Sequence, residues 1–124
     1  MSQINSFKDL TVYQKAYRLA MDIFEISKTF PREEKYSLTD QIRRSSRSVT
    51  SCIAESWAKR RYVKSFINKL TDSLGEEYET EVWLDYSRDC GYITIQKHKD
   101  LLTGYDEVRR MLISMISCPG KWCK

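Results

Sequence analysis

The sequence has few of the residues that break helices, and it has no long apolar run. Four glycines and two prolines are spread over 124 residues, which is too few for many short strands and suits a few long helices. No apolar run approaches the roughly 18 residues that a membrane-spanning helix needs, and the N-terminus is too polar for a secretory leader. We therefore expect a cytoplasmic protein that does not enter the membrane.

Residues that commonly serve catalysis or metal binding are also scarce. His98 is the only histidine, and we expect it at the surface. A ferritin-like metal site needs Glu-x-x-His pairs on two helices, but Ile95 stands three residues before His98. Glu77 and Glu81, one turn apart, are more typical of a solvated acidic face than of a cation site. The sequence therefore predicts no catalytic residue and no metal site.

Other catalytic motifs and cysteine frameworks are missing as well. The chain contains no glycine-rich phosphate loop, no HExxH and no GxSxG. Its four cysteines form no close CxxC pair, so we expect buried or free thiols instead of a disulfide or metal framework. We conclude that the sequence predicts a protein that is not an enzyme and holds no cofactor.

The residues that are present are arranged in four segments with helical periodicity. Hydrophobic residues make up 41% of the chain and charged residues 31%, which is enough apolar material for one core. Three-and-four spacing of apolar residues predicts helices over about 9–29, 38–60, 63–89 and 95–117. Four such helices with short loops predict an all-α, antiparallel up-down-up-down four-helix bundle, with one domain over residues 1–124.

Local signals mark the ends of these helices. Asp9 is a candidate N-cap for the first helix, and Pro31 ends it because the residue before a proline avoids helical geometry. Ser37 is a candidate N-cap for the second helix, with Asp40 in its first turn. Gly91 is suited to the C-cap of the third helix.

The apolar stripes predict which side chains form the core. We expect these residues to be buried: Ile42, Val49, Ile53, Leu70, Leu74, Leu101, Tyr105 and Leu112. The stripe of the third segment continues through Tyr78, Val82 and Tyr86 and drifts slowly around the helix. Small residues such as Ser45 and Ser46 would let another helix approach the second helix closely. Gly75 costs the third helix roughly 1 kcal/mol relative to alanine, which a close helix contact would explain.

Charge is distributed unevenly between the second and third segments. Residues 40–64 have a net charge of +5, and residues 72–89 have a net charge of −6. The cationic side chains of the first region are the candidate nucleic-acid-binding residues Arg43, Arg44, Arg47, Lys59, Arg60, Arg61 and Lys64. Trp57 and Tyr62 lie among them, and their rings could stack on unpaired bases.

Three interpretations of this polarity stay open. The basic residues could bind phosphates, with an affinity that falls as salt rises. The basic and acidic surfaces could instead pair, within a subunit or between subunits, and so fix the register of assembly. Both could also be ordinary solvated faces.

The chain resembles a known family over roughly residues 7–116. The resemblance is carried by FKDLTVYQKA, FPREEKYSLTDQIRRSSRSVTSCIAES, DSLGEEYETEVW and GYIT. These segments are similar to the four-helix-bundle proteins encoded in intervening sequences of bacterial large-subunit ribosomal RNA genes. The family usually reads Asn-Ile-Ala-Glu-Gly where this chain has Cys52-Ile53-Ala54-Glu55-Ser56.

The resemblance implies properties that the composition does not show. Members of the family form homopentameric rings, so a homo-oligomer, with five subunits, is the expected assembly. Related bundles are accessory variability determinants of diversity-generating retroelements, in which a basic pentamer accompanies a reverse transcriptase and its template RNA. A sequence-independent association with RNA or DNA, and a reverse transcriptase as a candidate protein partner, are therefore implied. A pure assembly module without nucleic-acid binding is the alternative.

Overall fold

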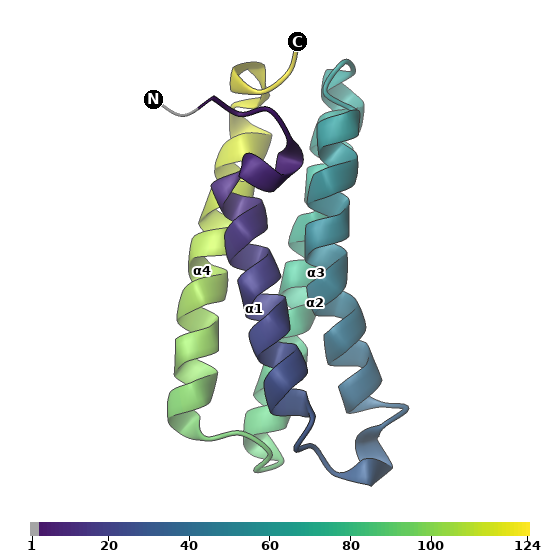
Figure 1. The fold of residues 1–124 in the computed structure, drawn as a ribbon, viewed down its shortest axis with the longest axis vertical. Helices are drawn as coiled ribbons and strands as arrows, with labels where there is room; N and C mark the ends of the chain where they lie inside the picture. The colour runs from purple at the N-terminus through teal and green to yellow at the C-terminus, as the bar shows by residue number, and fades with distance from the viewer. Residues whose placement is uncertain (1–2) are drawn as a thin grey trace.

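Four long helices form an antiparallel bundle in the computed structural model, which describes residues 3–124 (Figure 1). The long helices are α1 Thr11–Ser27, α2 Leu38–Ala58, α3 Val63–Asp89 and α4 Ile95–Ser117. Three short 3-10 turns accompany them: η1 Phe7–Asp9, η2 Arg32–Glu34 and η3 Pro119–Lys121. No strand occurs in residues 3–124, so the predicted all-α bundle is confirmed. Met1 and Ser2 of the predicted domain lie outside the described residues.

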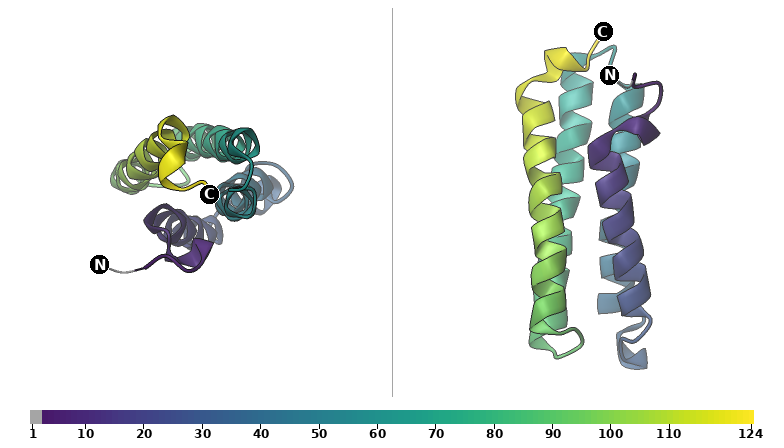
Figure 2. Two further views of the ribbon diagram at one scale, coloured as in Figure 1. Left: turned by 90° about the horizontal axis from the view of Figure 1, so that it is seen from above. Right: turned by 60° about the vertical axis from the view of Figure 1, so that its left-hand side comes forward.

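Each helix packs against the next one in the chain, and α4 closes the bundle against α1 (Figure 2). This arrangement puts α1 and α3 at opposite corners. Both ends of the described chain lie at the same end of the bundle as the turn between α2 and α3 (Figure 1). Within the described residues, no helix combines the length and apolar character that crossing a membrane requires.

Both ends of α1 and the end of α2 differ from the predictions by two residues, whereas the bounds of α3 and α4 match them. Asp9 does not cap α1, because its carboxylate accepts the backbone N–H groups of Asn5 and Ser6 in a capping box around η1. Ser37 occupies the N-cap position of α2, but its hydroxyl donates to Glu34 at 2.7 Å and makes no cap bond. Gly91 has a φ of 79°, the left-handed conformation that ends α3 as expected.

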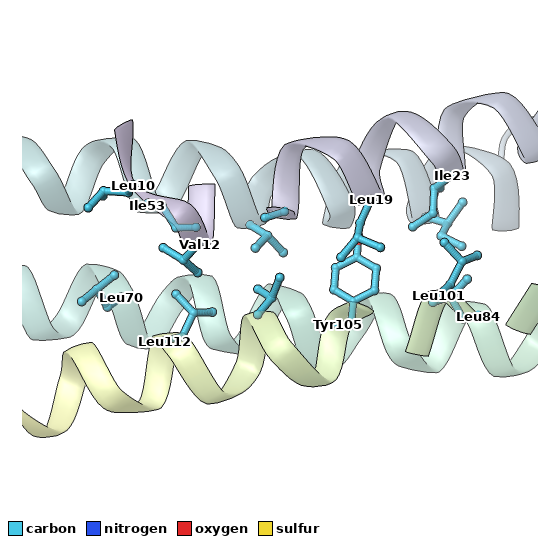
Figure 3. Close-up of a cluster of buried hydrophobic side chains, with 14 of the residues drawn as sticks. Leu10, Val12, Leu19, Ile23, Ile53, Leu70, Leu84, Leu101, Tyr105 and Leu112 are labelled. Carbon is cyan, nitrogen blue, oxygen red and sulfur yellow. The ribbon is translucent and has the colours of Figure 1, made fainter. Parts of the chain in front are cut away.

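The core contains the side chains predicted from the stripes, with one exception (Figure 3). The confirmed residues are at most 2% exposed: Ile42, Val49, Ile53, Leu70, Leu101, Tyr105 and Leu112. Leu74 was expected among them, but it is only partly buried at the edge of the core.

The apolar stripe of α3 drifts around the helix, as predicted, and leaves the core after the first three turns. Residues four apart advance by about 40° around a helix of 3.6 residues per turn, so a stripe with that spacing leaves the core. Tyr78, Val82 and Tyr86 accordingly lie on the outer surface and are 47–56% exposed. The buried face of the same stretch carries mainly polar residues, namely Ser73, Glu77, Thr80, Leu84 and Ser87.

Small residues let α2 and α3 approach closely, as the sequence predicts. The Thr80 hydroxyl donates to the Ser45 hydroxyl at 2.8 Å across the two helices. The Ser73 hydroxyl donates to the backbone carbonyl of Val49, also at 2.8 Å. These bonds satisfy polar groups that would otherwise be costly to bury, and they fix the register of α2, which carries Arg43, Arg44 and Arg47, against the acidic helix α3.

Candidate nucleic-acid interface

Three of the candidate arginines lie side by side on α2. Arg43, Arg44 and Arg47 line a shallow groove of about 520 Å³. The groove also contains Asp40, Ser48 and Ser51. The spacing of three and four residues along one helix brings the arginines together, so this part of the site was predictable from sequence alone.

Arg44 is held by the acidic helix. Its Nη2 lies 2.6 Å from Glu79 Oε1, and its Nη1 lies 3.4 Å from Glu76 Oε2. The hydrogen bond that the Arg44 guanidinium donates to the Glu79 carboxylate raises the pKa of Arg44. Arg44 therefore links α2 to α3 within the subunit, and its charge is largely balanced before any ligand arrives.

Arg43 and Arg47 lie over the ring of Phe24 from α1. The Arg43 guanidinium carbon is 4.9 Å from the ring centroid, and its Nε donates to the Ser27 hydroxyl at 2.8 Å. The Arg47 guanidinium is farther from the ring, at 5.7 Å. Arg43 is partly buried, whereas Arg47 is exposed. Neither has a carboxylate partner among residues 3–124.

The other four cations surround the turn between α2 and α3. Arg60 is fixed there, because its guanidinium stacks on Trp57 at 3.7 Å and its Nε donates to the Trp57 carbonyl. Trp57 also packs edge-on against Trp122, so its ring is not open to a base. Tyr62, in contrast, is 62% exposed.

The remaining cations of the turn are exposed: Lys59, Arg61 and Lys64. No ion pair joins them to a carboxylate in the part of the chain that the structure describes. Twelve residues separate Lys59 from Arg47, which is about 18 Å along the helix. The predicted residues therefore form two groups, one on α2 and one around the turn between α2 and α3, rather than one patch. We call them the α2 groove (Arg43, Arg44, Arg47) and the α2–α3 turn group (Lys59, Arg60, Arg61, Lys64).

The acidic charge of α3 is mostly balanced inside the subunit. Glu81 lies 3.0 Å from Arg109 of α4, and Asp89 accepts a hydrogen bond from Arg88. Asp85 lies 2.8 Å from His98 Nε2. Pairing within the subunit, one of the open interpretations, thus accounts for much of the acidic helix.

The expectation of an exposed His98 is wrong. Its side chain is 8% exposed, because it lies three and seven residues before Leu101 and Tyr105 and shares their face of α4.

Glu77 is not solvated either, since it is fully buried. Burial raises the pKa of Cys52, which keeps that thiol protonated and unreactive. Across residues 3–124, no group of three His, Cys, Asp or Glu side chains is placed to hold a metal ion.

Two exposed apolar surfaces were missed by the sequence analysis. The α3 outer face consists of Gly75, Tyr78, Val82 and Tyr86. The α1 outer face consists of the exposed Tyr17 and Met21 and of Tyr13, which is partly buried against the core. The signal was present in the spacing, since a stripe of residues four apart rotates away from the core.

Comparison with known proteins places the chain in a family. The model of the 23S rRNA-intervening sequence protein family matches residues 8–114. This chain belongs to that family. A solved structure from the S23 ribosomal protein family of Bacteroides thetaiotaomicron, described as a protein of unknown function, is 31% identical with a TM-score of 0.76. The alignment covers 86% of this chain and 95% of that one. No significant match was found among curated proteins.

The range matched by the intervening-sequence family includes the surfaces described above. The α2 groove, the α2–α3 turn group and both outer faces lie within residues 8–114. These surfaces therefore belong to the family domain itself and not to an appended segment.

Proposed function

We propose that this intervening-sequence protein is a non-enzymatic, homo-oligomeric scaffold that binds RNA or DNA without sequence specificity. The observation that supports this most directly is that four of the candidate cations are exposed and have no carboxylate partner among residues 3–124. They are Arg47, Lys59, Arg61 and Lys64. Cations that serve to balance acidic residues of the same subunit should lie beside a carboxylate, as Arg44 and Arg109 do.

These side chains suit phosphate rather than bases. Arginine forks match phosphate oxygens, and lysines act as point charges near them. Four such contacts give modest affinity in one subunit, but an oligomer repeats them and gains affinity through multivalency. The exposed Tyr62 lies within the α2–α3 turn group and offers a ring for stacking on a single strand. Single-stranded RNA is thus the preferred ligand.

The expected assembly and cellular partner come from the family resemblance. Five subunits in a ring, located in the cytoplasm, are the expected form. An accessory role beside the reverse transcriptase of a retroelement is the most specific version of the proposal. A reverse transcriptase gene next to the coding sequence would support that version, and a position inside a ribosomal RNA gene would argue for the other branch of the family.

A pure assembly module is the second candidate function. It is favoured by the Arg44 contacts, which use one of the predicted arginines inside the subunit, and by the two exposed apolar faces. In that case the free cations would be solvated and would bind no nucleic acid.

Charge reversal distinguishes the two candidates. Arg47→Glu with Arg61→Glu removes one free cation from each basic group, and Lys35→Glu with Lys99→Glu makes the same charge change at exposed positions elsewhere. Binding of labelled single-stranded RNA is measured by fluorescence anisotropy over a salt series. The proposal expects weak binding by the first variant, with a salt slope reduced by about 1.4 for two lost contacts, and little change in the second. No binding by wild type at low salt, or equal losses in both variants, would reject the nucleic-acid role.

A further inference from the structure

The two glycines inside long helices have different surroundings. A Cβ atom on Gly104 of α4 would lie 2.6 Å from Leu19 Cδ2 of α1, so the packing of α1 against α4 explains that glycine. A Cβ atom on Gly75 of α3 would meet nothing within 4 Å. Gly75 lowers the stability of α3, and no close packing within the subunit compensates for that loss. A close approach from outside the subunit would explain it.

The surface around Gly75 is suited to such an approach. Tyr78, Val82 and Tyr86 follow it on the same outer face of α3 and are about half exposed. This apolar strip continues into a groove of about 620 Å³ between α3 and the start of α2. Tyr36, Leu38, Trp83 and Tyr86 line that groove together with polar neighbours. A contiguous apolar surface of this kind is typical of a protein interface.

The α1 outer face carries a strip with the same spacing and length. Tyr13, Tyr17 and Met21 repeat every four residues, as Tyr78, Val82 and Tyr86 do, so both strips are about 12 Å long. The α1 strip lines a hollow of about 570 Å³ that also includes Lys8 and Arg18. The two faces lie on helices at opposite corners of the bundle (Figure 2).

Charge decides which faces meet. Asp72 and Glu79 border the α3 outer face. Asp72 shares Lys69 with Glu55, and Glu79 shares Arg44 with Glu76, so each set of two carboxylates and one cation keeps a net negative charge. Two α3 faces packed together would bring these like charges against each other, which is unfavourable at an interface. Lys8 and Arg18 border the α1 outer face and have no carboxylate partner among residues 3–124. The acidic rim of one face therefore complements the basic rim of the other.

We infer that the α3 outer face, around Gly75, docks onto the α1 outer face of a second copy of this chain. The inference rests on the self-assembly in the proposed function and specifies its interface. Because the two faces differ, the contact is head-to-tail, and repeating it leads to a closed ring if the rotation closes. The α2–α3 turn group takes no part in this contact and stays available to nucleic acid.

Single substitutions test each face by light scattering coupled to gel filtration. Val82→Glu adds a charge to the α3 outer face, and Tyr17→Glu adds one to the α1 outer face. Each variant is expected to run as a 14.7 kDa monomer. Gly75→Leu is expected to lower the mass as well while keeping the helical circular dichroism, because the new side chain has open space within the subunit. The control is Ile95→Glu, at an apolar position that is 78% exposed and outside both faces.

A mixture of the two monomeric variants tests the pairing itself. The Val82→Glu chain keeps a working α1 face, and the Tyr17→Glu chain keeps a working α3 face. Mixed at high concentration, they are expected to form a one-to-one dimer and nothing larger.

Each of the other outcomes rejects a specific part of the proposal. A monomeric wild type would reject both the self-assembly and this interface. An oligomeric wild type with an oligomeric Val82→Glu variant would reject only the α3 docking surface. If Tyr17→Glu alone stays oligomeric, or if the mixture stays monomeric, the α1 outer face is not the surface that binds the α3 outer face.

Discussion

Glu77 and Tyr105 face the core together, and neither has a hydrogen-bond partner. Both side chains are fully buried, and both carboxyl oxygens of Glu77 and the hydroxyl of Tyr105 are unpaired in the described structure. Burial, and then the nearby charge of Glu77, raise the pKa of the Tyr105 phenol. Burial, followed by the neighbouring Glu81 carboxyl, raises the pKa of Glu77 from 4.5 to about 9. Glu77 is therefore a neutral acid at pH 7.

This relationship makes stability depend on pH. A proton is bound to Glu77 in the folded state up to about pH 9 but is lost from the unfolded chain above about 4.5. The stabilising effect is fully present below pH 4.5 and is lost as pH rises toward 9. The free energy of unfolding should thus fall by up to about 1.4 kcal/mol per pH unit from this group. Arg109 acts against the shift, and Asp106 acts with it.

Glu77→Gln checks this linkage by urea denaturation at several pH values and one protein concentration. The amide has the same shape and does not titrate, so the variant should lose less stability than wild type between about pH 6 and 8 and be more stable than wild type at pH 8. Equal pH slopes for the two proteins would show that Glu77 is ionised in the folded state.

Truncation of Ile53 should strongly destabilise the bundle. Ile53 is fully buried in α2, and removing a buried isoleucine to alanine typically costs about 2–5 kcal/mol. The matched change Ile95→Ala, at a position 78% exposed, should cost within about 0.5 kcal/mol. Denaturant unfolding measures both, and an Ile53→Ala protein as stable as the Ile95→Ala protein would remove Ile53 from the core.

Arg44 and Arg47 should have opposite effects on stability and nucleic-acid binding. Arg44→Gln removes the contacts to Glu79 and Glu76. Because these groups are partly exposed, the coupling energy between Arg44 and Glu79 should be only about 0.2–1 kcal/mol in a double-mutant cycle. Arg47→Gln removes no ion pair and should leave stability nearly unchanged while weakening RNA binding. Weaker RNA binding by Arg44→Gln than by Arg47→Gln would reverse these roles.

The sequence was sufficient for the parts of the fold that depend on one helix at a time. The stripes of α2 and α4 mix spacings of three and four, so Ile42, Val49, Ile53, Leu101 and Leu112 stay on one face and could be assigned to the core. The α3 stripe uses spacings of four and rotates outward. The buried positions of α3 carry serine, threonine and glutamate instead. Polar residues of these types are not expected in a core, so the sequence did not indicate that they are buried.

The candidate site was predictable to the same extent. Arg43, Arg44 and Arg47 are neighbours because they share a helix. That Arg44 meets Glu79, and that Arg43 lies over Phe24, depends on how three helices pack, which local spacing does not contain. The packing of Trp122 against the Trp57 ring likewise joins residues that are far apart in the sequence.

The central claim is that one assembly both self-associates and carries nucleic acid. The most direct measurement is light scattering coupled to gel filtration of the purified wild-type chain, run with and without single-stranded RNA at low salt. We expect a mass several times the 14.7 kDa chain, and a larger complex containing both protein and RNA when RNA is added. A 14.7 kDa monomer that elutes separately from the RNA would contradict the account.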